Sequence, residues 1–150
     1  MRNLTTLFVF LFLAACGGGD APAMDDAPAA DEPAAVTMAD FAGTWTNTAM
    51  LEGTPDPVTT VMTGSDDGME WTMTLEDRDP VALSASMSGD SLILMSEPYE
   101  SILRDGVTVT VRTAGVLSDG RMVGTLVATY MTPDGEQVVQ GTIEGLRGGM

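Results

Sequence analysis

Met69-Glu70-Trp71-Thr72-Met73-Thr74-Leu75-Glu76 is the stretch that decides the fold of this chain. Large apolar residues occupy every second position, and polar residues occupy the positions between them. Successive side chains of a β-strand point to opposite faces, so this alternation predicts a strand with one buried face and one wet face. The same period of two recurs in residues 81–87 and 107–112, and no segment shows the 3.6-residue period of a helix.

Turn signals separate these segments at regular intervals. Asp-Gly between alternating segments is a strong hairpin signal, because glycine adopts the backbone conformations that tight turns need. The signals are Asp67-Gly68, Asp79-Pro80, Gly89-Asp90, Asp105-Gly106, Asp119-Gly120 and Pro133-Asp134-Gly135. They predict antiparallel strands at residues 42–50, 57–64, 69–76, 80–87, 91–96, 107–117, 121–131 and 137–145. Residues 96–104 are either a long loop or a ninth strand.

The predicted fold class is all-β, with about eight strands in one domain at residues 38–147. A meander of antiparallel strands must hide the backbone groups of its edge strands, and closure into an up-and-down β-barrel removes the edges altogether. The sequential hairpins favour this barrel. A two-sheet β-sandwich is the alternative.

The charge of the chain excludes several function classes. It carries 22 acidic residues against six basic ones and no histidine, a formal net charge of −16. Nucleic-acid binding is not expected, because Lys and Arg must neutralise the phosphates. All six basic residues are arginines, so the catalytic triads, Schiff bases and metal sites that need histidine or lysine are missing. Asp66-Asp67 and Glu76-Asp77-Arg78-Asp79 lack the ligand order of a calcium loop. We expect no enzyme, cofactor or metal site.

Residues 1–15 have the form of a secretory signal peptide. Arg2 supplies a positive end, residues 4–13 are mostly apolar, and Ala14-Ala15 precede the single cysteine, Cys16. The apolar run of about 10–12 residues is too short for a membrane-spanning helix, which needs about 20. Residues 16–37 are rich in Gly, Ala, Pro and acidic side chains, so we expect a disordered tether there.

Leu13-Ala14-Ala15-Cys16-Gly17 resembles the lipobox of bacterial lipoproteins. The resemblance implies that Cys16 receives a diacylglycerol, that the signal peptide is cut just before it, and that the new amino terminus is acylated. Two or three acyl chains hold a protein stably on a membrane. Glycine rather than aspartate follows the cysteine, which by resemblance to enterobacterial lipoproteins implies an outer-membrane location in the cell envelope. Either face of that membrane fits.

Phe41-Ala42-Gly43-Thr44-Trp45 resembles the Gly-x-Trp opening of the lipocalin and fatty-acid-binding-protein superfamily. Members are antiparallel barrels that bind small, mostly apolar molecules. The resemblance implies that Trp45 plugs the closed base of the barrel and that Arg147 stacks on it. It also implies that the loop at residues 50–57 helps cover the open mouth. The short helix that precedes the first strand in lipocalins is not evident in this sequence.

The inward face of the barrel supplies the candidate ligand-binding residues. If Trp71 and Val109 point inward, alternation places other large apolar residues beside them: Met69, Met73, Leu75, Leu83, Met87, Val107 and Val111, with Leu126, Tyr130, Val139 and Ile143. The ligand-binding candidates are Met50, Leu51, Trp71, Met73, Leu83, Met87, Val109, Val111, Leu126 and Tyr130.

Two functions are compatible with these patterns. The first is a membrane-anchored envelope lipoprotein whose barrel binds a small apolar or amphipathic ligand without chemistry. The alternative is a structural or protein-interaction lipoprotein with a filled barrel, which presents acidic loops to an envelope protein partner. An accessible apolar cavity favours the first function, and a packed interior favours the second.

Overall fold

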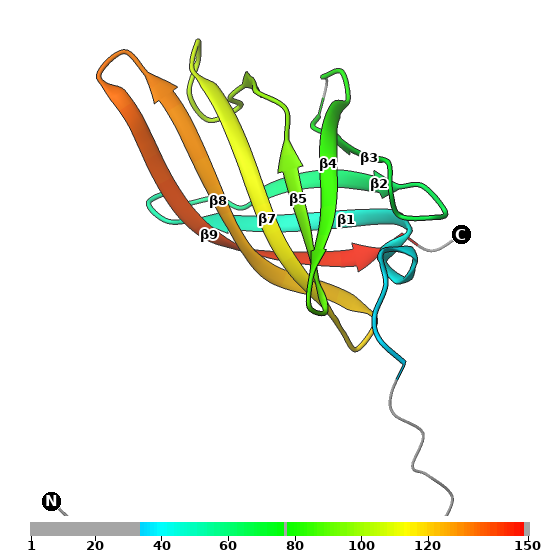
Figure 1. The fold of residues 1–150 in the computed structure, drawn as a ribbon. Coiled ribbons are helices and arrows are strands. Elements are labelled where there is room, and N and C mark those ends of the chain that lie inside the picture. Colours follow the sequence, from blue (N-terminus) through cyan, green and yellow to red (C-terminus); the bar gives the residue numbers. More distant parts are fainter. Residues whose placement is uncertain (1–33, 77, 149–150) are drawn as a thin grey trace, which may run out of the picture. The chain divides into compact units, whose positions relative to one another are not determined.

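The computed structural model describes residues 34–76 and 78–148. A 3-10 turn, η1 (Met38–Phe41), precedes nine strands: β1 (Gly43–Leu51), β2 (Val58–Gly64), β3 (Trp71–Thr74), β4 (Val81–Ser88), β5 (Ser91–Ser96), β6 (Tyr99–Glu100), β7 (Thr108–Ser118), β8 (Arg121–Thr132) and β9 (Gly135–Arg147) (Figure 1). The described residues belong to one compact unit, which contains every described strand. No helix among the described residues is long and apolar enough to cross a membrane.

Eight of the nine strands close into an up-and-down barrel. Each strand from β1 to β5 pairs with the next one along the chain, as does each strand from β7 to β9, and β9 returns to β1. Antiparallel pairing of β5 with β7, in which Leu92 lies opposite Gly115, completes the ring. The predicted barrel is therefore confirmed, and the two-sheet sandwich is excluded because the hydrogen-bonded order has no break.

The short strand β6 continues β5 along the same edge of β7. Met95 lies opposite Arg112 and Tyr99 lies opposite Val109. Between these two pairs the β5–β6 side therefore contains one residue more than β7. Such an extra residue interrupts the ladder as a β-bulge does. The Ser96 hydroxyl accepts a hydrogen bond from the Val111 amide (2.8 Å) at this break. Residues 96–104 thus hold the end of β5, a two-residue strand and part of a loop.

The predicted turns lie where the strands reverse. Asp119 and Gly120 have φ angles of 50° and 75°, the left-handed pair that a two-residue type I′ hairpin needs. Every strand boundary lies within two residues of the predicted one, and the stretch 69–76 is shortened at both ends to the four-residue β3. At the start of β3 the reason is local, because the Asp67 carboxylate accepts a hydrogen bond from the Met69 amide (3.0 Å) and the Ser65 hydroxyl accepts one from the Glu70 amide (3.0 Å). These bonds extend the turn to the start of β3.

The inward face is largely the one that the alternation predicts. Most of the expected residues are buried or pack against the core: Trp71, Met73, Leu75, Leu83, Met87, Val107, Val109, Val111, Leu126, Tyr130, Val139 and Ile143. Met69 is the exception, with 66% of its surface exposed. The prediction for Met69 was wrong because this residue belongs to the extended turn and precedes β3.

Trp45 closes one end of the barrel, which we call the base. The register pairs Trp45, near the start of β1, with Arg147 at the end of β9. The indole is fully buried, and its Nε1 donates a hydrogen bond to the Phe41 carbonyl (2.7 Å). The Arg147 guanidinium carbon lies 4.6 Å from the centroid of the Trp45 ring, and the guanidinium also donates to the Asp40 carbonyl. Arg147 therefore joins the tryptophan to η1.

The turn η1 lies beside this base, where the sequence gives no helix signal. Four residues are too few for a periodic pattern, and local hydrogen bonds hold the turn instead. The Thr37 amide and hydroxyl both donate to the Asp40 carboxylate (2.7 and 2.8 Å), which lowers the pKa of Asp40. Val36, in the segment expected to be a tether, packs against the core together with Met38.

Replacing Trp45 by alanine should lower the free energy of unfolding by about 3–5 kcal/mol, because it removes a large buried aromatic and leaves a cavity. Urea unfolding followed by circular dichroism measures the change. Arg147→Ala is the matched control, since it removes the exposed cation above the ring and its hydrogen bond to the Asp40 carbonyl, and it should cost about 1–2 kcal/mol. A cost below about 1 kcal/mol for Trp45→Ala would show that Trp45 does not plug the base.

Candidate ligand-binding site

The barrel interior is filled near the base and hollow near the opposite end, which we call the mouth. The mouth is the end at which the loops after β1, β3, β6 and β8 lie. A largely apolar cavity of about 50 Å³ lies inside it. A cavity of this size accommodates water or the tip of an alkyl chain, since about 150 Å³ is needed for benzene. Six of the predicted residues line it: Leu51, Met73, Val109, Val111, Leu126 and Tyr130.

Four of the predicted ligand-binding residues do not line this cavity. Met50 is 46% exposed and lies on the outer face, because its neighbour Leu51 points inward and adjacent residues of a strand face opposite sides. Trp71 is buried near the base, where its Nε1 donates to the Gly68 carbonyl (2.7 Å). Leu83 and Met87 belong to the core or pack against it. Alternation along a strand predicts the face of a residue but not its height in the barrel.

The loop after β6 covers the cavity. Ile102 and Leu103 line the cavity and remain 40% and 42% exposed, so they separate it from solvent. The buried Ser101 hydroxyl shapes the loop by accepting hydrogen bonds from the amides of Leu103 (3.0 Å) and Arg104 (3.1 Å). The cover at the mouth therefore comes mainly from residues 101–104. Of the expected covering loop at 50–57, only Leu51 lines the cavity.

Arg104 fastens this covering loop to the barrel wall. Its guanidinium carbon lies 4.0 Å from the centroid of the Tyr130 ring, and its Nη1 donates to Gln137 Oε1 (2.7 Å). Tyr130 lies on β8 and Gln137 on β9, so both contacts reach strands across the mouth. Each such cation–π contact contributes about 0.5–2 kcal/mol.

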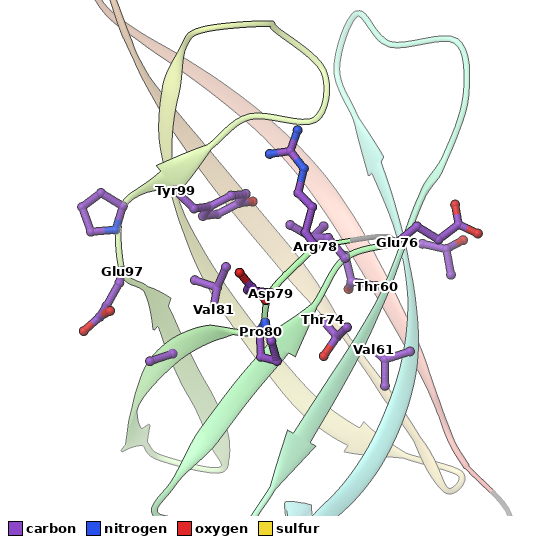
Figure 2. Close-up of a pocket in the computed structure, with 14 residues that line it drawn as sticks. Thr60, Val61, Thr74, Glu76, Arg78, Asp79, Pro80, Val81, Glu97 and Tyr99 are labelled. Carbon is purple, nitrogen blue, oxygen red and sulfur yellow. The ribbon is translucent and has the colours of Figure 1, made fainter.

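A larger groove of about 1060 Å³ opens through the barrel wall at the mouth (Figure 2). It exists because β3 ends at Thr74 and pairs with β2 only from Val61 onward, which leaves the first residues of β2 unpaired on that side. Figure 2 shows Thr60 on one side of the groove, and Val81 and Tyr99 on the other. Thr60, Leu75 and Tyr99 line both the groove and the inner cavity, so the two spaces adjoin.

Thr60 carries an unpartnered hydroxyl at this junction. The residue is only 7% exposed, and its Oγ1 has no hydrogen-bond partner within the described part of the protein. Leaving a buried polar group unpaired costs about 1–3 kcal/mol. The hydroxyl can both donate and accept a hydrogen bond, so it is the group best placed to bind a polar atom of a ligand.

The two tyrosines of the chain lie at the same site. Burial raises the pKa of Tyr99 to about 12, the nearby Tyr130 adds to this effect, and Arg78 opposes it. Burial also raises the pKa of Tyr130, against the effect of Arg104. Arg78 spans the groove, since its Nη1 donates to the Glu100 carbonyl (2.6 Å) and so joins the turn after β3 to β6.

Sequence reasoning missed the polar and loop residues of the site. Thr60 occupies an inward position of β2, but a threonine in a strand gives no signal of an interior hydroxyl. Ile102 and Leu103 are adjacent apolar residues in a segment without periodicity, so alternation cannot assign them to the interior. No group of three or more acidic or cysteine residues that could hold a metal ion occurs among the residues described.

No family model, curated protein or solved structure matches this chain. Its functional assignment therefore rests on the geometry of the cavity, the groove and the residues between them. A concave, mostly apolar space with a few convergent polar groups is the usual form of a small-molecule site.

The two tyrosines should ionise at a higher pH in the folded protein than in the unfolded protein. We expect little ionisation at pH 10 and a transition for Tyr99 near pH 12, measured by absorbance at 295 nm. In urea both should titrate near pH 10. The pKa of Tyr99 is higher in the folded than in the unfolded protein. The free energy of unfolding therefore does not depend on this group below about pH 10, and it falls as the pH rises from 10 toward 12. Tyr99→Phe should remove the latest transition, and ionisation of both folded tyrosines near pH 10 would contradict their burial.

Proposed function

We propose that this chain is a lipid-anchored envelope lipoprotein whose lipocalin-like barrel binds a small amphipathic ligand at its mouth, without chemistry. The observation that carries the proposal is the unpartnered Thr60 hydroxyl, because it lies where the apolar cavity adjoins the open groove. The cavity of about 50 Å³ holds only the tip of a ligand. The remainder occupies the groove, which is open to water and lined partly by charged residues.

Several features of the lining support binding rather than packing alone. Met62 and Met73 border the cavity, and methionine side chains adapt their shape to different apolar partners. The cover formed by Ile102 and Leu103 belongs to a loop, so it can be displaced without breaking a strand pairing. A ligand longer than the present cavity gains room in this way.

The small size of the cavity also fits the alternative function. The base half of the barrel is filled by its own side chains, including the fully buried Phe41 and Trp45. A barrel with little interior space suits a protein-interaction lipoprotein, which would present its acidic loops to a basic partner in the envelope. Binding of a small molecule at the mouth separates the two functions.

The anchor is proposed from the lipobox, and Cys16 lies outside the described residues. Cys16→Ala should abolish incorporation of labelled fatty acid and leave the signal peptide attached, because acylation of the thiol precedes cleavage in that pathway. Mass spectrometry of the protein expressed in a bacterial host measures both changes. Ser91→Ala, a substitution within the barrel, should be processed normally. Normal acylation of Cys16→Ala would contradict the anchor.

Ligand binding can be tested with methionine-methyl NMR on residues 34–150, the compact unit that holds the whole barrel. Hexan-1-ol should shift the methyl signals of Met62 and Met73, which line the cavity, and leave those of the exposed Met69 and Met95 in place. Ala128→Leu should abolish the shifts, because Ala128 lines the cavity and a larger side chain fills it.

Ala114→Leu is the matched control, since Ala114 does not line the cavity. Cooperative thermal unfolding of both variants confirms that they fold. Unchanged Met62 and Met73 signals, or equal shifts at exposed and buried methionines, would contradict binding in the interior.

A further inference from the structure

The charges around the groove indicate what kind of head group it accepts, an inference that rests on the proposed ligand binding. Glu76, Asp79 and Glu97 line the groove with three carboxylates, and Arg78 contributes one guanidinium. Within the described residues the only ion pair is Arg121–Glu144, outside the groove, so none of the three carboxylates is paired there. The described lining groups therefore carry a net negative charge, in a chain whose formal net charge is −16.

The arginine of the groove is held by a hydrogen bond to β6. Arg78 donates a hydrogen bond to the Glu100 carbonyl (2.6 Å), and Figure 2 shows its side chain extending toward the segment that follows Tyr99. The same view shows the Asp79 carboxylate turned toward the space below the Tyr99 ring. A negative group at an opening bordered by apolar wall raises the local concentration of cations.

The residues at the inner end of the groove also suit a cation. The unpartnered Thr60 hydroxyl, in a residue more than nine-tenths buried, can accept a hydrogen bond from an ammonium N–H. The Tyr99 ring is an aromatic wall of the same space, and aromatic faces attract cations. Figure 2 shows the Glu76 and Glu97 carboxylates turned outward, so an anionic head at this end would meet the Asp79 carboxylate.

We infer that the ligand is an amphipathic cation, an alkyl amine whose ammonium binds in the wall groove between Asp79 and the Thr60 hydroxyl. Its alkyl chain passes Leu75 and Tyr99, which border both spaces, and its tip enters the inner cavity. The apolar contacts at the cavity and the charged contacts at the groove then act on opposite ends of one small molecule.

The test uses three probes with the same six-carbon chain: hexylammonium, hexan-1-ol and hexanoate, each titrated at pH 7 into residues 34–150. Met62 and Met73 methyl shifts give the dissociation constants. Hexylammonium should bind about tenfold more tightly than hexan-1-ol, which corresponds to ~1.4 kcal/mol. Hexanoate should bind most weakly. Added salt should reduce the preference for the amine, because the carboxylates of the groove are exposed.

Two variants locate the head group. Asp79→Asn should bring hexylammonium affinity close to that of hexan-1-ol and leave hexan-1-ol unchanged. Asp90→Asn is its matched control, because it removes one exposed carboxylate in the turn between β4 and β5, away from the groove. Thr60→Val keeps the side-chain shape and should weaken both hexylammonium and hexan-1-ol by removing the hydroxyl.

The outcomes distinguish this inference from the proposed function. Equal binding of the amine and the alcohol, with Met62 and Met73 shifted, keeps the ligand-binding function and overturns the cation preference. Tighter binding of hexanoate overturns it as well and assigns the head group to Arg78. If none of the three probes shifts Met62 or Met73, the proposed function itself fails. Equal effects of Asp79→Asn and Asp90→Asn would show a general charge effect rather than a site.

Discussion

Closure of the ring by hydrogen bonds between β5 and β7 is the constraint on which the rest of the structure depends. Without that pairing both strands would present an open edge to water and to other chains. The ring closes although its strands differ greatly in length, from four residues in β3 to thirteen in β9. A closed ring with short strands on one side has a lower wall on that side. The groove of Figure 2 lies there, so it is a consequence of how the barrel closes.

Closure leaves two ends to be sealed, and this chain seals them differently. At the base, Trp45 and Trp71 are buried and each donates its indole N–H to a backbone carbonyl. Gly64 leaves the room that Trp71 occupies, since a Cβ there would overlap the indole. With a single cysteine the chain has no internal disulfide, so this packing must supply the stability. At the mouth a loop forms the seal, and its side chains Ile102 and Leu103 are less buried than the two tryptophans.

The fold could be predicted from the sequence because it depends on patterns that span only a few consecutive residues. A period of two and an Asp-Gly turn such as Asp119-Gly120 fix strands and hairpins locally, and ring closure then follows from edge avoidance. The site could be predicted only in part. Leu126 and Tyr130 reach the cavity as expected, but the height of a residue in the barrel depends on strand stagger, which alternation does not encode. The late start of β3 depends on the Asp67 and Ser65 side chains, whereas the groove at the mouth follows from the end of β3 at Thr74.

Two buried polar atoms lack hydrogen-bond partners among the described residues. Their surroundings indicate which of the two belongs to the packing of the fold and which to a ligand site. Asn47 Oδ1 is completely buried near the base, with Gly145 so close that a Cβ there would overlap it. Its amide nitrogen donates to the Trp45 carbonyl (3.2 Å), so Asn47 belongs to the packing of the base. Thr60 lines both the cavity and the groove, with its Oγ1 buried where the two spaces adjoin. A valine would match its shape without the cost of an unpaired hydroxyl. That cost is recovered only when something polar enters the groove, which is why we assign Thr60 to the ligand and Asn47 to the fold.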